Sequence, residues 1–117
     1  MKKGTLDELT QLAIKFRDER DWKQFHNPKD MALSLVLEAA EVLELMQWIN
    51  GDELAKHLKA NSARLGEELS DVLFWVLAMS QDSGIDLADA FRKKLKANAR
   101  KYPIEKSKGK SNKYTEL

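Results

Sequence analysis

The sequence predicts an all-α fold, a bundle of four to five helices, and three observations support this. No segment shows sustained alternation of apolar and polar residues with β-branched enrichment, the pattern of a half-buried strand. Apolar residues recur instead at spacings of three and four, and helix-start and helix-stop residues separate these segments. A chain of 117 residues supports one domain with a single core. We expect residues 1–103 to form that domain and residues 104–117 to form a basic C-terminal tail.

The first two helices are predicted from residues that favour helix ends. A Thr-x-x-Glu capping box at Thr5 predicts a helix over about 5–20, followed by a non-helical connection. Asn27 as N-cap and Pro28 at the first helical position predict the start of a second helix. Gly51 is expected to end this helix near residue 50.

Three further helices are expected in the second half of the chain. A short helix is predicted over 52–60 and a longer one over about 63–82, which Gly84 ends. Asp86 caps a last long helix that must stop before Pro103, because the residue preceding a proline is pushed out of the α region. The lysine-rich remainder is expected to be mobile unless it docks on the protein.

Composition and charge exclude several classes of protein. The chain has no cysteine, so we expect neither disulfides nor thiolate chemistry and assign it to the reducing cytoplasm. Its longest uncharged apolar run, residues 72–81, is about half of the roughly 20 residues that a membrane helix needs. A net charge of +1 argues against binding to a nucleic-acid polymer. The charge is uneven, because residues 92–117 hold ten Lys or Arg against two acids.

The second predicted helix is apolar nearly all round when its residues are projected at about 100° each. A helix of this kind is buried on most sides, and so short a chain has little material of its own to cover it. We therefore expect a second subunit to cover it. The apolar positions are Leu35, Val36, Leu37, Val42, Leu43 and Leu45.

Two of the predicted helices repeat one arrangement of acidic residues. Each presents two carboxylates three residues apart, which places them on one helix face, with a tryptophan one or two turns further on. The members are Glu38, Glu41 and Trp48 in the earlier helix, and Glu68, Asp71 and Trp75 in the later one.

This repetition points to a metal site. Four carboxylates that converged in an apolar interior would repel one another and have raised pKa values unless divalent cations lay among them. Oxygen ligands without cysteine indicate Mg²⁺, with Mn²⁺ as the alternative, and neither pair contains the Glu-x-x-His of di-iron bundles. The competing interpretation is that each pair lies on a solvated face, which is common in a chain that is one-third charged.

The last long helix offers groups suited to a phosphate. Lys94 and Asn98, four residues apart, border an apolar seam, and a lysine beside a metal site supplies the additional positive charge that a polyphosphate needs. The alternative, that Lys94 only covers the seam with its aliphatic stem, has equal weight on this evidence.

The motifs together resemble those of a known family. ExxE (Glu38, Glu41), ExxD (Glu68, Asp71) and the later KxxxNxxxYP are similar to the motifs of the MazG-like all-α nucleoside triphosphate pyrophosphohydrolases. The stretches ERDWKQFHNP, GEELSDVL, NARKYP and KYTEL resemble the dCTP pyrophosphatase subgroup, and the similarity runs from about residue 6 to the end. Ala13, Leu37 and Lys101 depart from the family pattern, and none of them is an expected metal ligand.

The resemblance implies a reaction and a set of roles. The four acids would hold Mg²⁺, and water would cleave between the α and β phosphates to give a nucleoside monophosphate and pyrophosphate. We favour Glu41 as the base that accepts the proton from water. The family assembles as homodimers, often paired into homotetramers, with sites at subunit interfaces. The residues expected around the base are Trp22, Gln24, Phe25, His26, Trp48 and Trp75, and those expected on the phosphates are Lys94 and Asn98.

The expected function is therefore Mg²⁺-dependent hydrolysis of dCTP and modified deoxycytidine triphosphates, which removes them from the nucleotide pool. Two alternatives remain. One keeps the mechanism but acts on dUTP or on a broad set of triphosphates. The other is a non-catalytic helical interaction module, in which the tryptophans mark a groove for a partner and the acids are solvated.

Overall fold

The computed structural model describes residues 4–117, and all regular elements in this range are helices, so the all-α prediction is confirmed. The described chain forms two compact units that divide after Gly84. The first unit contains α1 (Leu6–Glu19), the short 3-10 helix η1 (Lys23–Phe25), α2 (Pro28–Glu44), α3 (Asp52–Ala60) and α4 (Ser62–Asp82). The second contains α5 (Leu87–Lys101), α6 (Ile104–Ser107) and the 3-10 helix η2 (Tyr114–Glu116). Among the described residues no helix is long and apolar enough to cross a membrane.

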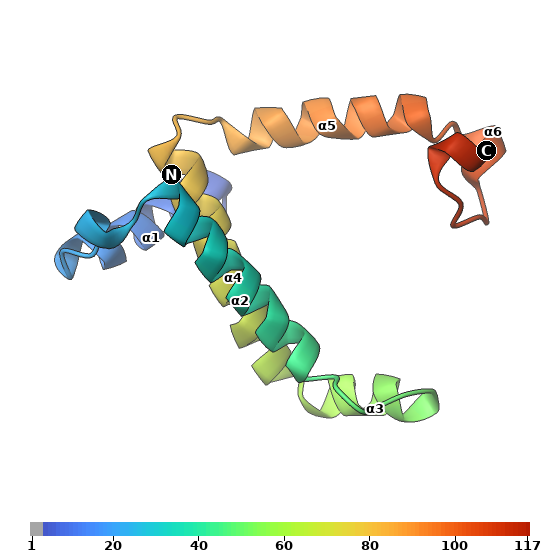
Figure 1. Cartoon of the computed structure of the whole chain (residues 1–117), viewed down its shortest axis with the longest axis horizontal. Helices are drawn as coiled ribbons and strands as arrows, with labels where there is room; N and C mark the ends of the chain where they lie inside the picture. The colour runs from blue at the N-terminus through green and yellow to red at the C-terminus, as the bar shows by residue number, and fades with distance from the viewer. Residues whose placement is uncertain (1–3) are drawn as a thin grey trace. The chain divides into compact units, whose positions relative to one another are not determined.

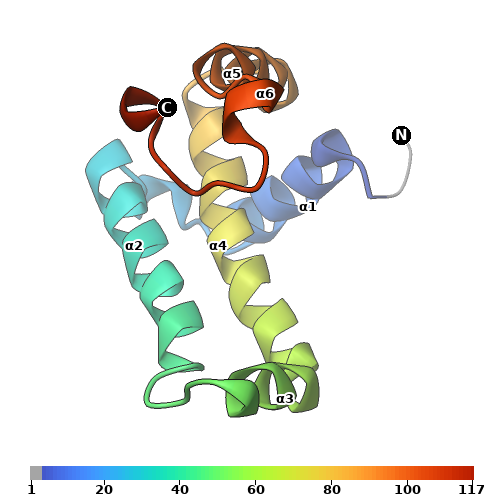
Figure 2. The same cartoon turned by 90° about the vertical axis from the view of Figure 1, so that its right-hand side faces the viewer.

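Helix α4 is the central element of the first unit. Both views show α2 lying alongside it in the opposite direction, with α3 connecting their ends (Figures 1 and 2). Helix α1 packs against α4 as well. The most buried apolar side chains come from α1, α2, the residue after α2, and α4: Ala13, Met31, Leu45, Leu77 and Ala78.

The predicted helix starts are confirmed by their hydrogen bonds. The Thr5 hydroxyl accepts from the Glu8 amide at 3.1 Å, and the Asn27 side chain accepts from the Asp30 amide at 2.9 Å. Asp86 caps α5 in the same way. Each bond satisfies an amide that has no partner within its helix, so these helix starts follow from local sequence alone.

The predicted end of α2 is wrong. The helix stops at Glu44, and the chain then turns through residues 45–48 with amides bonded three residues back, as in Met46 to Leu43. Trp48 takes a left-handed conformation, φ +70°, which a non-glycine residue seldom adopts. Across this turn His57 of α3 donates a hydrogen bond to the carbonyl oxygen of Leu45, the residue that follows the helix.

The end of α1 is closed by a Schellman motif built without glycine. The Trp22 amide donates to the Arg17 carbonyl at 3.1 Å, and the Asp21 amide donates to the Asp18 carbonyl at 3.0 Å. Asp21 supplies the left-handed residue of the motif, with φ +53°. The chain is thereby directed from α1 into η1, a single helical turn within the segment that was expected to be a non-helical connection.

In the second unit the C-terminal segment has regular structure, where a mobile tail was expected unless it docked. It forms α6 and η2, and it returns to the end of α5. There the Tyr114 ring meets the Tyr102 ring edge-on at 6.0 Å, and the Lys101 ammonium lies 4.9 Å from the Tyr114 ring centre.

Candidate metal centre and adjoining pocket

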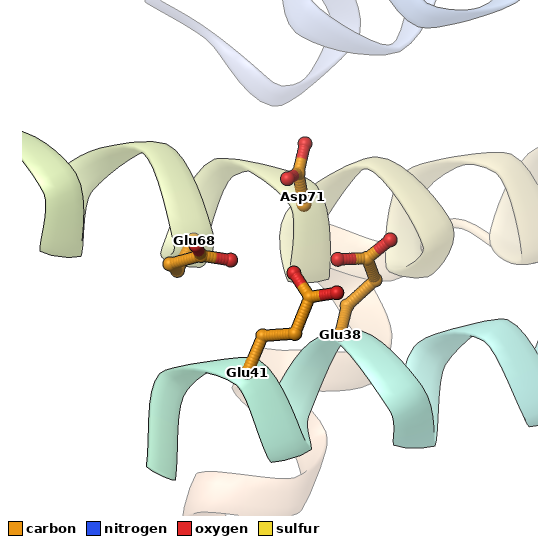
Figure 3. Close-up of side chains that lie close together, drawn as sticks. All are labelled: Glu38, Glu41, Glu68 and Asp71. Carbon is orange, nitrogen blue, oxygen red and sulfur yellow. The ribbon is translucent and has the colours of Figure 1, made fainter. Parts of the chain in front are cut away.

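The four predicted acids lie together. Glu38 and Glu41 project from α2, and Glu68 and Asp71 come from α4, which runs alongside it (Figure 3). One carboxylate oxygen from each residue lies within 4.8 Å of the others. The i, i+3 spacing on two neighbouring antiparallel helices is what brings the two pairs into one cluster.

The carboxylates destabilise one another's charged forms. Partial burial, followed by repulsion from Glu41 and Asp71, raises the pKa of Glu38. A hydrogen bond with Glu41 is the largest cause of the raised pKa of Glu68, and burial and repulsion add to it. One oxygen of Glu68, Oε2, is buried without a hydrogen-bond partner. The cluster therefore carries more negative charge than its own surroundings neutralise.

This donor set fits a hard divalent cation. All four donors are carboxylate oxygens, and a buried oxygen without a partner is available as a ligand. A doubly charged cation would remove both the repulsion and the unsatisfied acceptor. Mg²⁺ takes oxygen ligands in octahedral geometry and commonly shares them between carboxylates and substrate phosphates.

An apolar pocket of about 580 Å³ adjoins the cluster. Glu38 and Asp71 belong both to its wall and to the acidic cluster. Its remaining lining is largely aliphatic and aromatic, and comes from α1, Trp22 and α4: Leu9, Leu12, Ala13, Phe16, Trp22, Ser70, Leu73, Phe74, Trp75 and Leu77. A pocket of this size that ends at a cation site is suited to an aromatic ring linked to an anionic group.

The residues predicted to surround a base divide into two groups. Trp22 and Trp75 line the pocket. His26 does not line the pocket, but its ring lies edge-on to the Trp75 ring at 5.0 Å. Gln24 and Phe25 are exposed, and the Gln24 amide donates to the Asp21 carboxylate at 3.0 Å.

Trp48 does not share a helix face with Glu38 and Glu41, and the prediction that it does was wrong because α2 ends at Glu44. Its side chain is 88 % exposed and lines a second, shallow hollow with residues of α3, among them Glu53 and His57. The structure therefore does not bring Trp48 to the pocket of its own chain. Its role in binding a base stays a prediction.

Lys94 and Asn98 lie on α5, in the second unit. They are one helical turn apart on the same face, as the sequence predicted. Their contact with phosphates stays a prediction.

Sequence reasoning missed two residues that the structure brings together. Arg17 is 1 % exposed, and its guanidinium donates to both oxygens of Asp82, at 2.7 and 3.0 Å. One signal was available, because Arg17 follows the buried Ala13 by one turn. Nothing local in the sequence pointed to Asp82, 65 residues away.

The family is established by comparison. The model of the MazG-like family matches residues 33–117, and the chain belongs to this family. dCTP pyrophosphatase 1 from Homo sapiens is 40% identical over 115 residues, which cover 97% of this chain and 68% of that protein. The protein of that name from Bos taurus is 39% identical over the same length. A crystal structure of a pyrophosphatase from Archaeoglobus fulgidus superposes with a TM-score of 0.81 and 35% identity, covering 88% of this chain and 96% of that one.

Proposed function

We propose that this chain is a nucleoside triphosphate pyrophosphohydrolase that cleaves dCTP to dCMP and pyrophosphate with Mg²⁺. The observation that carries the proposal is the convergence of Glu38, Glu41, Glu68 and Asp71 at one wall of an aromatic pocket. Its relatives named dCTP pyrophosphatase 1 support the choice of substrate. A helical module without activity would not need four carboxylates held within 4.8 Å of one another.

The acids would hold Mg²⁺ through their carboxylate oxygens. When bound, the ion supplies Lewis-acid stabilisation of phosphate charge and makes water more acidic. Glu41 is exposed, and of the two acids on α2 it is the one that does not line the pocket, so it is our candidate to accept the proton from the attacking water. The water oxygen forms a bond to phosphorus while the bond to the oxygen that bridges the α and β phosphates breaks.

The pocket would receive the nucleoside. Trp22 and Trp75 offer aromatic faces for stacking on a base, at about 1–3 kcal/mol for each base stacked. Stacking alone does not select cytosine, so polar groups must read the edge of the base. Among the residues that line the pocket, Ser70 offers a hydroxyl for this, although its own proton is donated to the Gly66 carbonyl at 2.7 Å.

The active form would be a homodimer or a homotetramer in the cytoplasm. Apolar side chains of α2 remain exposed in the single chain, including Val36 at 64 % and Leu43 at 68 %. A second copy would bury this surface. The base site would then be completed by Trp48 of the second copy and by Gln24 and Phe25, which lie beside Trp22. The phosphates would be contacted by Lys94 and Asn98. Residues 1–103 would form the catalytic domain and 104–117 its basic extension.

The test is hydrolysis of a panel of nucleoside triphosphates by the purified chain with Mg²⁺. We expect dCMP and pyrophosphate from dCTP, at a higher kcat/KM than the corresponding products from dUTP, dTTP or purine triphosphates. Equal rates for all bases would reject the preference for cytosine and leave a broad pyrophosphohydrolase. Failure to release pyrophosphate from any of them, with either Mg²⁺ or Mn²⁺, would reject the proposed function.

A further inference from the structure

The buried ion pair of Arg17 and Asp82 joins the two helices whose residues form the pocket. Ala13 and Phe16, on α1, and Phe74 and Leu77, on α4, line the pocket within about two helical turns of the pair. The Arg17 side chain is almost completely enclosed, whereas that of Asp82 is 21 % exposed. A bidentate guanidinium–carboxylate contact fixes both the distance and the relative orientation of the groups that make it.

Arg17 also holds the segment that leaves α1. Its backbone carbonyl accepts the Trp22 amide at 3.1 Å, within the Schellman motif that closes the helix. The Trp22 ring then meets the Phe16 ring edge-on at 5.6 Å. Arg17 therefore contacts the last residue of α4 through its side chain and Trp22, in the pocket wall, through its backbone carbonyl.

The linkage continues to the second tryptophan of the pocket. The Trp22 carbonyl accepts the Phe25 amide at 3.0 Å, and the Lys23 carbonyl accepts the His26 amide at 2.9 Å, which closes η1. The His26 ring is thereby placed against Trp75. Trp75 and Asp82 both belong to α4. The contacts therefore run from Asp82 through Arg17 and the segment after α1 to His26, and return to α4 at Trp75.

We propose that Arg17 and Asp82 are a positioning pair that holds Trp22, and through His26 also Trp75, in the geometry in which they contact a nucleobase. This inference rests on the proposed function, which assigns the base to this pocket. An ion pair that is largely withdrawn from water contributes little net stability compared with apolar residues of the same volume. Such a pair instead fixes the relative position of the two helices that carry it. Here that position determines where both tryptophans of the pocket lie.

The pKa of His26 depends on the charges of the Arg17–Asp82 pair. The charged groups that act on its ring are Arg17 from α1 and Asp82 from α4, and Lys23 of its own segment acts on Asp82. Burial and the Arg17 charge lower the pKa of His26, and Asp82 opposes them. The Nδ1 atom of His26 is buried without a hydrogen-bond partner. The pKa of His26 reports whether the pair is intact.

The experiment compares four variants with the wild-type chain. Arg17→Met with Asp82→Leu replaces the pair by apolar side chains of similar size, Arg17→Lys keeps the charge without the bidentate contact, and Arg17→Met or Asp82→Asn alone removes one partner. Asp18→Asn is the matched control, because Asp18 lies 3.7 Å from the Arg17 Nε but has an exposed side chain. For each variant kcat and KM for dCTP, the indole NMR signals of Trp22 and Trp75, and the pKa of His26 are measured.

We expect KM to rise about tenfold in the double variant while kcat stays within about threefold, because the metal ligands are untouched and the loss is one of base stacking. Arg17→Lys should give an intermediate KM, and Asp18→Asn the wild-type value. The pKa of His26 should rise in Arg17→Met and fall in Asp82→Asn. If a single variant does not fold, the double variant and Arg17→Lys decide the question.

A double variant with wild-type KM and unmoved indole signals would overturn the positioning role. The role would also be rejected if kcat and KM changed only in proportion to a loss of folded protein. If the wild-type chain does not hydrolyse dCTP, the proposed function fails by itself. The pair is then judged by the indole signals alone, and wild-type signals in the double variant overturn it.

Discussion

The imidazole of His57 donates from Nε2 to the carbonyl oxygen of Leu45 at 2.8 Å, across the turn that leads from α2 to α3. A carbonyl can only accept, so this contact fixes the proton on Nε2. Leu45 directly follows α2, where carbonyls have no partner within the helix. The turn that contains Trp48 in its left-handed conformation is thus held at one end by a side chain from the next helix.

Replacing His57 by Phe should loosen this turn. We expect a loss of about 1 kcal/mol in the free energy of unfolding, because the Leu45 carbonyl loses its hydrogen bond. The amides of residues 46–49 should also exchange faster with deuterium. Denaturant unfolding and hydrogen exchange measure the two effects, and Lys59→Gln on the exposed side of α3 is the control. Unchanged exchange in the His57 variant would show that the bond does not hold the turn.

Replacing Glu38 by Gln should have opposite effects on activity and on stability. Turnover of dCTP with Mg²⁺ should fall by at least about 100-fold, the upper range for losing even an outer partner of a metal site. In EDTA the midpoint of thermal unfolding should rise, because one of four mutually repelling carboxylates is gone. Glu44→Gln is the matched control, since Glu44 lies on the same helix, is exposed and is outside the cluster. Equal losses of activity in both variants would contradict the assignment.

The stability of the metal-free protein should depend on pH through the cluster. The pKa values of Glu38 and Glu68 are raised above the ordinary 4.5, so the folded state keeps protons at these groups after the unfolded chain has released them. Their contribution to stability is complete below the unfolded pKa and is lost as pH rises through the folded values. Denaturant unfolding in EDTA at several pH values measures this.

The control for that titration is the double variant Glu38→Gln with Glu68→Gln. Two other groups contribute with the opposite sign, since Arg17 lowers the pKa of Asp82 and burial lowers that of His26. The difference between wild type and the double variant isolates the cluster. Saturating Mg²⁺ should stabilise the wild type and not the double variant, and the wild type should then gain stability as the carboxylates ionise. A difference that Mg²⁺ leaves unchanged would argue against a cation at these four residues.

Replacing Trp22 by Ala should weaken substrate binding more than catalysis. The Trp22 indole lines the pocket and is not one of the four acids. Its stacking on a base is worth about 1–3 kcal/mol. We expect KM for dCTP to rise about tenfold or more and kcat to change little. Trp22→Phe keeps an aromatic face and should recover most of the affinity. A loss confined to kcat would place Trp22 outside the base site.

A charge on the exposed apolar face of α2 should dissociate the assembly. Leu43→Lys introduces an ammonium on a surface that a second copy would bury, and sedimentation velocity should then show monomers. Glu44→Lys, one position along the same helix, is the control and should keep the wild-type assembly. A wild-type chain that sediments as a monomer at micromolar concentration would reject the proposed homodimer.

Local physical chemistry explains why much of this fold follows from the sequence. Caps such as Thr5 and Asn27 are satisfied within four residues, so the helix starts were predicted correctly. The two acidic pairs, each with i, i+3 spacing, converge once their helices lie side by side. The cluster of four carboxylates could therefore be predicted from the sequence. The end of α2 was predicted wrongly, and the hydrogen bond that spans the turn there joins Leu45 to His57, 12 residues away.

The sequence by itself determined an all-helical MazG-like chain with two acidic pairs on separate helices. Only the tertiary structure decided which side chains share the pocket: it placed Trp22 and Trp75 in its wall, turned Trp48 away from it, and buried Arg17 against Asp82. The physical reason is range. Helix propensity and capping act within one or two helical turns. A buried ion pair and a pocket wall depend on how helices pack, and that packing joins residues far apart in the sequence.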